Sequence, residues 1–376
     1  MPSPAAPSDD DAWRLGVEEE YLLVDRGAGD LRQDSATVRR VVRSVFGEDI
    51  DPELLRSQVE VATPVCATIE DAATHLIRLR EQVGAAAGTV DCHLVAVGSH
   101  PTARWADQEV TDKTRYHDLE RAMAQVALET VICGLHVHVG VPDPDDRIRA
   151  LNATRGWLGP LLALSASSPY WEGRDTGFAS FRTPVFRRWP QTGVPHAMTD
   201  WADFAALVDA LVAAGAVDDG TNLYWDLRPS VRFPTVELRV ADACPRLDDG
   251  LTVASLARAV VRAALDPACT PPSKTADLRT EVLEAAVRGA ARHGLNGELI
   301  SPRNGRLAPA REVVGELLDW CGPALDASGD RDRAENGVDR ILTDGNSADR
   351  QRRAYAERES FADVVALLAA ETAGSA

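Results

Sequence analysis

The stretch Gly16–Tyr21, GVEEEY, lies inside the apolar run LGVEEEYLLVD and combines a strand-like pattern with three adjacent carboxylates. Side chains on a β-strand point alternately to the two faces of a sheet. Glu18 and Glu20 therefore share one face, whereas Glu19 points to the opposite face with Val17. The stretch predicts a strand that places two acids side by side and leaves Glu19 incidental to their function.

Two neighbouring carboxylates repel each other, so one of them raises its pKa unless a cation is bound. Mg²⁺ and Mn²⁺ prefer oxygen ligands, which makes a metal site one interpretation of Glu18 and Glu20. The other interpretation is an exposed strand edge whose acids are solvated. The stretch alone favours the solvated strand edge, so evidence for a metal site has to come from other parts of the sequence.

Composition limits the partners of this chain of 376 residues, which is 45% hydrophobic and 26% charged. The formal net charge is −18, and nucleic acids and anionic membranes both attract basic surfaces. We therefore expect small-molecule partners and neither nucleic acid nor membrane. No apolar run reaches the roughly 18 residues that a membrane span requires. A homo-oligomer is left open.

The six cysteines form no C-x-x-C pair, so we expect buried thiols in a reducing cytoplasm and no zinc site. Residues 1–12 have no apolar core and are expected to be a disordered leader, not a signal peptide. Residues 371–376 are expected to be a tail. Between them, residues 13–370 are predicted to form a single catalytic domain.

Predicted strands are concentrated before about residue 245, and helical patterns dominate after it. This segregation favours an α+β fold with a helical C-terminal part over a doubly wound parallel sheet. The chain contains neither G-x-x-x-x-G-K-[ST] nor G-x-G-x-x-G, so a nucleotide site would be of neither the P-loop nor the Rossmann type.

Three further predicted strands place polar residues at alternate positions on one face. SQVEVA carries Gln58 and Glu60, and GLHVHVG carries His136 and His138. TVELRV carries Glu237 and Arg239, with apolar residues on its reverse face. The neighbouring NLYWDLR is predicted to place four polar side chains on a single face: Asn222, Tyr224, Asp226 and Arg228.

Each strand alone has an ordinary explanation, such as core histidines or a cross-strand ion pair. One sheet that lines a single polar cavity explains all of them together. Carboxylates with an imidazole suit divalent cations, and arginines bind phosphate or carboxylate oxygens in a bidentate manner. Metal-binding acids beside arginines are typical of a phosphoryl-transfer site.

The motifs GVEEEY, SQVEVATP, GLHVHVG, WDLRP with TVELRV, and GNSADRQR near the C-terminus resemble the glutamate–cysteine ligase type 2 family, in its branch of short carboxylate–amine ligases. The resemblance extends from about Trp13 to Leu368. It implies the glutamine synthetase-like fold, in which an antiparallel sheet binds ATP and divalent metals on its concave face. It also implies amide-bond formation coupled to ATP hydrolysis.

Carried over to matching positions, the resemblance implies a set of metal ligands for Mg²⁺ or Mn²⁺. The G-x-E-x-E strand contributes two acids, and the Q-V-E strand contributes one. The first histidine of H-V-H-V-G and the glutamate of V-E-L-R complete the set. These residues are Glu18, Glu20, Glu60, His136 and Glu237.

The same resemblance implies roles for other residues on these strands. His138 would face the phosphates of the nucleotide, and Arg239 and Arg228 would hold the γ-phosphate or an acyl-phosphate intermediate. Arg182, in FASFRTPVF, would bind the substrate carboxylate. We expect Gln58, next to Glu60 on the same face, to contact substrate as well.

The segment Tyr170–Ala197 is rich in arginine, aromatic residues, glycine and proline and shows little periodicity. Long irregular loops in compact domains usually have a function. We predict a substrate lid, in which aromatic side chains exclude water and Arg182 holds a second carboxylate of the substrate. The alternative is a surface loop with an apolar underside.

Together these features predict an ATP- and Mg²⁺-dependent carboxylate–amine ligase that works through an acyl phosphate. The default substrates are L-glutamate, through its γ-carboxylate, and L-cysteine. Two alternatives remain open: a metal-dependent amidohydrolase that uses the H-x-H motif, and a non-catalytic member of the same fold.

Overall fold

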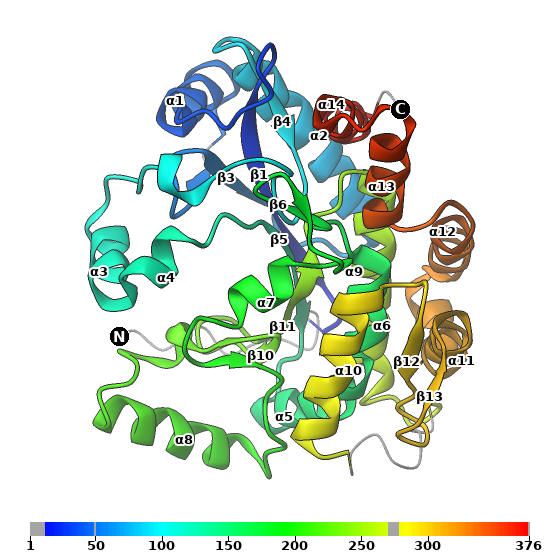
Figure 1. The fold of residues 1–376 in the computed structure, drawn as a ribbon. Coiled ribbons are helices and arrows are strands. Elements are labelled where there is room, and N and C mark those ends of the chain that lie inside the picture. Colours follow the sequence, from blue (N-terminus) through cyan, green and yellow to red (C-terminus); the bar gives the residue numbers. More distant parts are fainter. Residues whose placement is uncertain (1–11, 49, 270–277, 375–376) are drawn as a thin grey trace.

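A computed structural model describes residues 12–48, 50–269 and 278–374, and a seven-stranded sheet forms the centre of this part of the chain (Figure 1). The strand order is β10-β11-β5-β1-β3-β2, and β4 pairs with the second half of β1. All of these pairs are antiparallel. The strands are β1 (Leu15–Asp25), β2 (Asp51–Pro52), β3 (Gln58–Ala62), β4 (Cys92–Val95), β5 (Gly134–Gly140), β10 (Leu227–Pro229) and β11 (Thr235–Asp242).

Helices surround this sheet, and most of them pack against its apolar face or against one another. The N-terminal half contributes α1 (Ser35–Phe46), α2 (Ile69–Gly88), α3 (Thr114–Met123), α4 (Gln125–Leu128), α5 (Pro144–Thr154), α6 (Leu158–Ser165) and α7 (Arg182–Phe186). The rest are α8 (Trp201–Ala213), α9 (Leu247–Ala263), α10 (Thr280–His293), α11 (Ala310–Ser328), α12 (Arg331–Asp344), α13 (Ser347–Arg358) and α14 (Phe361–Thr372). Figure 1 shows α10–α13 on the right of the molecule, away from α3 and α4 on the left.

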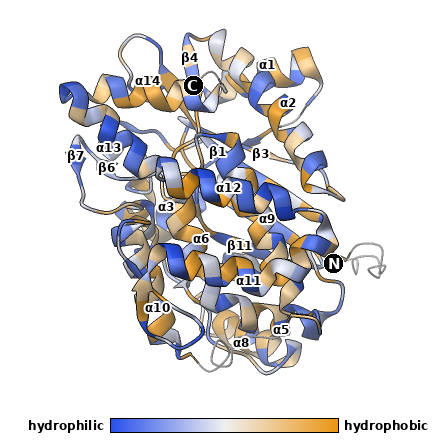
Figure 2. Cartoon of the chain, turned by 90° about the vertical axis from the view of Figure 1, so that its right-hand side faces the viewer, coloured by the Kyte–Doolittle hydropathy of each residue, from blue (hydrophilic) through white to orange (hydrophobic). Residues whose placement is uncertain are grey.

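The alternating pattern of the central strands explains where the core lies. Leu135, Val137 and Val139 of β5 are all almost completely buried, and β5 contacts α9 on this apolar side. Helix α9 is buried on nearly all of its surface because α6, α11 and α12 cover it. Figure 2 shows α11 and α14 with both hydrophilic and hydrophobic stretches, as expected for amphipathic helices.

Glu19 points away from Glu18 and Glu20, as predicted, and it has a structural role that the sequence did not indicate. Its side chain points to the core face, where it is 1% exposed, and it accepts hydrogen bonds from Nε and Nη2 of Arg80 at 3.0 and 2.6 Å. The hydroxyl of Tyr21 also donates to Glu19. Arg80 lies on α2 and donates to the carbonyls of Cys244 and Pro245 as well. Glu19 therefore ties β1 to α2 and to the chain that leads into α9.

Several expected elements differ in detail from the observed ones. The segment expected as an irregular loop contains α7 and three short strands: β6 (Tyr170–Trp171), β7 (Arg174–Asp175) and β8 (Thr192–Gly193). The last of these pairs with β9 (Tyr224–Trp225). The C-terminal part is not helical throughout, because the pair β12 (Glu298–Ile300) and β13 (Leu307–Pro309) interrupts it.

Helix ends also differ from the expectation. Ala124 has a φ of 48° and separates α3 from α4, which follow each other directly along the chain. Helix α14 continues through Thr372, two residues into the expected tail. Residues 1–11 of the expected leader lie outside the described residues, and the single-domain assignment stays a prediction. Among the helices that the structure describes, none has the length and apolar character to cross a bilayer.

Candidate active site

The antiparallel register brings the polar positions of separate strands together. Glu18 on β1 lies opposite His136 on β5, and Glu20 on β1 lies opposite Glu60 on β3. On the other side of β5, His138 lies opposite Glu237 of β11. Directly opposed residues have Cβ atoms about 4.5–5.5 Å apart, so one polar surface runs across four strands.

A bulge in β11 places Arg239 over this surface. The register shifts between Leu238 and Ala241, so that Arg239 and Val240 both correspond to the position of His136 on β5. A bulge of this kind bends a strand and redirects its side chains. It also moves Asp242 onto the same face as Glu237, because Asp242 lies opposite Gly134.

The polar face of the sheet lines a cavity of about 480 Å³. All ten residues that were predicted to bind metal, nucleotide or substrate line this cavity: Glu18, Glu20, Gln58, Glu60, His136, His138, Arg182, Arg228, Glu237 and Arg239. The wall above the sheet includes aromatic side chains of α7 and its neighbours, among them Phe186, Trp189 and Tyr224. The structure therefore brings the predicted residues to one place, and their individual roles stay predictions.

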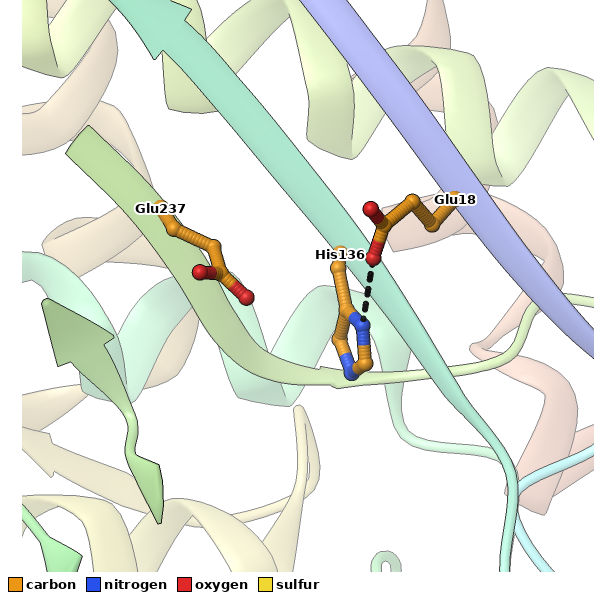
Figure 3. A group of neighbouring side chains, drawn as sticks. All are labelled: Glu18, His136 and Glu237. Atoms are coloured by element: carbon orange, nitrogen blue, oxygen red, sulfur yellow. Dashed lines mark hydrogen bonds and ion pairs between the residues drawn. The ribbon is translucent and has the colours of Figure 1, made fainter. Parts of the chain in front are cut away.

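Glu18, His136 and Glu237 form the first group of potential metal ligands, with one ligand atom of each within 4.8 Å of the others. Figure 3 shows Glu18 and Glu237 reaching toward His136 from the two neighbouring strands. Oε2 of Glu18 lies 3.2 Å from Nδ1 of His136. Its other oxygen, Oε1, lies 3.2 Å from Nε2 of His138. Burial acts to raise the pKa of Glu18, but hydrogen bonds with both histidines hold that pKa well below its usual range.

Glu20, Glu60 and His136 form a second group, in which one ligand atom of each residue again lies within 4.8 Å of the others. Oε1 of Glu20 lies 3.7 Å from Nε2 of His136, and Oε2 accepts a hydrogen bond from the Gly134 amide at 2.7 Å. Burial and the nearby charge of Glu53 raise the pKa of Glu20 to about 8. Burial and the charges of Glu53, Glu18 and Glu20 raise the pKa of Glu60 well above its ordinary value. The two acids thus crowd each other in a place where a cation would relieve the repulsion.

His136 belongs to both groups, and its environment favours the neutral ring. Burial, together with the charge of Arg239, lowers its pKa to about 4. A neutral His136 that donates its Nδ1–H to Glu18 leaves the lone pair of Nε2 on the side of Glu20. Metal-binding histidines commonly have this arrangement, in which a carboxylate fixes the tautomer.

Two arginines converge on Glu237. Nε of Arg228 donates to Oε2 of Glu237 at 2.7 Å, and Arg239 forms an ion pair with Oε1. Burial acts to raise the pKa of Glu237, but Arg239, His138 and Arg228 lower it to about 2. Arg228 also donates to backbone carbonyls on the segment before β9. The site therefore has an acidic side near Glu20 and a basic side near Glu237.

Arg182 and Gln58 reach the cavity from outside the central pair of strands. Arg182 begins α7, is 4% exposed, and donates from Nη2 to the carbonyl of Arg239 at 3.2 Å. Gln58 is 1% exposed, and its Nε2 donates to the carbonyl of Ile132 at 2.7 Å. That hydrogen bond supports the chain entering β5, and contact between Gln58 and substrate stays a prediction.

The segment Tyr170–Ala197 forms a wall that is fastened at several points. Nη1 of Arg187 donates to Oδ1 of Asp226 at 2.7 Å, and Nε1 of Trp189 donates to Oγ1 of Thr130 at 2.6 Å. These contacts favour a fixed wall over a mobile lid, and ordering of the segment by substrate stays a prediction.

The pattern read from NLYWDLR is wrong for two of its four residues. Tyr224 and Arg228 line the cavity, but Asp226 is 3% exposed and pairs with Arg187. Asn222 belongs to a short 3₁₀ turn. Alternation fails because the strand is interrupted at Asp226, between β9 and β10.

The sequence analysis missed several charged residues of the cavity. Glu53, in the turn after β2, lies close enough to Glu20 and Glu60 to raise the pKa of both. Lys113, Arg115 and Arg232 also line the cavity. These residues come from loops and from a helix end, where no periodic pattern marks a face. Only the proximity of Glu53 to a predicted strand could have suggested it.

Comparison with known proteins agrees with this geometry. The model of Glutamate-cysteine ligase family 2 matches residues 14–367. "Putative glutamate--cysteine ligase 2" of Paracoccus denitrificans is 38% identical over 374 residues, covering 96% of this chain and 98% of that protein. The protein of the same name from Salinispora tropica is 39% identical over 363 residues, covering 96% of this chain and 95% of that protein.

Solved structures share the fold at low sequence identity. The glutamate–cysteine ligase of Francisella tularensis in complex with AMP superposes with a TM-score of 0.71 at 14% identity, covering 96% of this chain and 89% of that chain. A bifunctional glutathione synthetase from Pasteurella multocida gives a TM-score of 0.71 at 15% identity, covering 97% of this chain and 53% of that chain. The predicted α+β class, with an antiparallel sheet and a helical C-terminal part, is confirmed. A family match over almost the whole chain and relatives of nearly equal length lead to one conclusion: the chain belongs to glutamate-cysteine ligase family 2.

Proposed function

We propose that the protein is an ATP- and Mg²⁺-dependent carboxylate–amine ligase that forms an amide bond through an acyl phosphate. The observation that carries this proposal is the pair of ligand groups that share His136, with Arg228 and Arg239 beside them. Acids that hold a metal next to arginines suit phosphoryl transfer, because little covalent chemistry is required of the protein.

The residues fit a hard divalent cation. The two groups offer Glu18, Glu20, Glu60 and Glu237 as carboxylates, with one imidazole, and Mg²⁺ and Mn²⁺ prefer such oxygen-rich sets. The raised pKa values of Glu20 and Glu60 support the same assignment, because a nearby cation would favour their charged forms. A bound cation would supply neutralisation of phosphate charge.

The chain's own groups would then bind and orient the reactants. The donor carboxylate attacks the γ-phosphorus of ATP, the bond to the β-phosphate oxygen breaks, and ADP leaves. The amine attacks the acyl carbon and displaces phosphate. Arg239 and Arg228 would hold the transferred phosphoryl oxygens, with His138 near the phosphates. Because Glu237 already orients both guanidinium groups, little reorganisation would accompany the reaction.

The names of the relatives and the position of Arg182 support the proposed substrates. Relatives at 38–39% identity carry glutamate–cysteine ligase names, which supports L-glutamate and L-cysteine as the first pair to test. Arg182 would bind the carboxylate of glutamate that does not react. The structural relative solved with AMP is consistent with a nucleotide in this fold.

The test is ATP turnover with a panel of amino acids and amines, with and without Mg²⁺. We expect release of ADP and phosphate that requires both a carboxylate substrate and the metal, together with an amide product detected by mass spectrometry. Amide hydrolysis without ATP would favour the amidohydrolase instead. Absence of both activities across the panel, in a protein that binds neither ATP nor Mg²⁺, would favour a non-catalytic member of the fold.

A further inference from the structure

The guanidinium group of Arg182 donates hydrogen bonds to two backbone carbonyls in the bulge of β11. Nη2 donates to the carbonyl of Arg239 at 3.2 Å, and Nη1 donates to the carbonyl of Val240 at 3.4 Å. These carbonyls are available because the bulge interrupts the pairing of β11 with β5. Gly134 leaves room for this arrangement, since a Cβ at that position would overlap Nη2 of Arg182.

A buried carboxylate, Asp242, lies just behind this contact. Its Oδ2 accepts hydrogen bonds from the Ser167 amide at 2.9 Å and from the Ser168 hydroxyl at 2.7 Å. Its Oδ1 accepts from the Ser180 hydroxyl at 2.8 Å and lies 4.0 Å from Nη1 of Arg182. Asp242 has no exposed surface, and it does not line the cavity.

The hydroxyl of Ser168 connects Asp242 to the backbone of Arg182. Oγ of Ser168 accepts a hydrogen bond from the Arg182 amide at 3.0 Å while its own proton points to Asp242. The carbonyl of Ser168 also accepts from the Phe181 amide at 2.8 Å. Ser180 precedes Arg182 by two residues. Asp242 therefore anchors the start of α7 and lies beside the guanidinium group of its first side chain.

The motif GNSADRQR supports the same turn from the opposite side. Gln351, in α13, donates from Nε2 to the carbonyl of Ser167 at 2.6 Å. Asn346, the N-cap of α13, donates to the carbonyl of Ala163 at 2.9 Å. Gln351 thus supports a residue that binds Asp242, and no residue of the motif lines the cavity.

We propose that Asp242 is a positioning residue that sets the guanidinium group of Arg182 for the carboxylate of the acidic substrate. The inference rests on the proposed function, because it assigns the second carboxylate of that substrate to Arg182. Burying the charged carboxylate of Asp242 costs free energy, and its three hydrogen bonds from Ser167, Ser168 and Ser180 offset part of that cost. Loss of its charge would leave the guanidinium group of Arg182 with two contacts to backbone carbonyls and the ring of Phe186, and with no carboxylate behind it.

The decisive variant is Asp242→Asn, which keeps the size of the side chain and removes its charge. We expect KM for the acidic substrate to rise about tenfold or more, while KM for ATP changes less than about twofold. Combined with Arg182→Ala, the Asp242→Asn change should add almost nothing to KM, because residues that act as one unit are not additive. Ser180→Ala removes one of the three hydrogen bonds and should produce a smaller change of the same kind.

Asp330→Asn is the matched control. Asp330 is also buried and pairs with Arg258, but neither residue lines the cavity. This variant should lower the melting temperature without separating the two KM values. If Asp242→Asn changes both KM values equally, or adds its full effect to Arg182→Ala, the positioning role is overturned. If the unaltered protein shows no turnover that depends on a carboxylate, the proposed function fails, and the positioning role fails with it.

Discussion

Glu18 and His136 lie opposite each other on β1 and β5, with Oε2 of the acid 3.2 Å from Nδ1 of the imidazole. This pair joins the two candidate ligand groups, since His136 belongs to both of them. Antiparallel pairing of two ordinary strands is enough to create the contact. Changes to the neighbouring acids therefore test the site without disturbing the core.

Glu20→Gln should reduce Mg²⁺-dependent ATP turnover by at least about 100-fold, because it removes one ligand charge at almost constant shape. The folded state should persist, and loss of repulsion with Glu60 should leave the melting temperature unchanged or higher. Steady-state turnover at several Mg²⁺ concentrations measures the loss of activity, and thermal unfolding measures the melting temperature. Glu281→Gln, on the surface of α10, is the control and should change neither. Full activity of Glu20→Gln would refute the metal assignment.

Arg239→Lys keeps the charge and loses the planar fork. We expect kcat/KM to fall by an amount equivalent to about 2–4 kcal/mol, the usual size for a group that stabilises developing negative charge. Steady-state kinetics with ATP and the carboxylate measure this. The control is Arg333→Lys, since Arg333 is also paired with a glutamate, Glu70, but outside the cavity. A loss of less than about tenfold would indicate that Arg239 is mainly an ion-pair partner of Glu237.

Arg182→Ala should raise KM for the acidic substrate far more than KM for ATP, because the variant removes the proposed contact to the second carboxylate. The comparison of the two KM values is the measurement. A rise in KM for ATP alone would place Arg182 at the nucleotide instead. Arg188→Ala is the control, since Arg188 belongs to the same segment and pairs with Glu129 outside the lining of the cavity.

Arg80→Met should lower the free energy of unfolding by about 3–5 kcal/mol, since it leaves the buried charge of Glu19 without its partner. Denaturant unfolding measures this loss. Adding Glu19→Leu should recover much of the stability, because the unpaired charge is then gone. If Arg80→Met alone is as stable as the unaltered protein, the prediction is wrong, and water reaches the carboxylate of Glu19 in that variant.

Burial lowers the pKa of His100 to about 4, from 6.5. Below pH 6.5 the unfolded chain binds a proton that the folded chain does not bind, so this contribution to stability is complete above pH 6.5. It is lost as the pH falls toward 4, at up to about 1.4 kcal/mol per pH unit. His100→Gln should flatten this part of the stability curve. Its amide oxygen can accept the hydrogen bonds that Nδ1 now accepts from the Thr102 and Ala103 amides.

His117→Gln provides the comparison for that experiment. His117 is partly exposed, and hydrogen bonds with Asp112 and Glu120 raise its pKa. Its contribution to the slope therefore has the opposite sign. If both variants change the stability curve in the same direction, burial of His100 is not the cause.

The sequence alone determined which residues face the cavity on the regular strands. Alternation with period two placed Glu18, Glu20, His136, His138 and Glu237 correctly, because a strand has only two faces and hydrophobic residues mark one of them. The order of the motifs also determined the family. Both the alternation and the order of the motifs can be read from the residues along the chain, without knowledge of contacts between distant segments.

Only the tertiary structure decided what depends on contacts between distant segments. Glu19 acquired its role from Arg80 on α2, and Glu53 joined the acids from a turn without periodicity. The bulge in β11 moved Asp242 to the face of Glu237, against the alternation that the sequence predicts. A bulge, a buried ion pair and a cavity all arise from packing between segments that are far apart in the chain, and no local pattern records them.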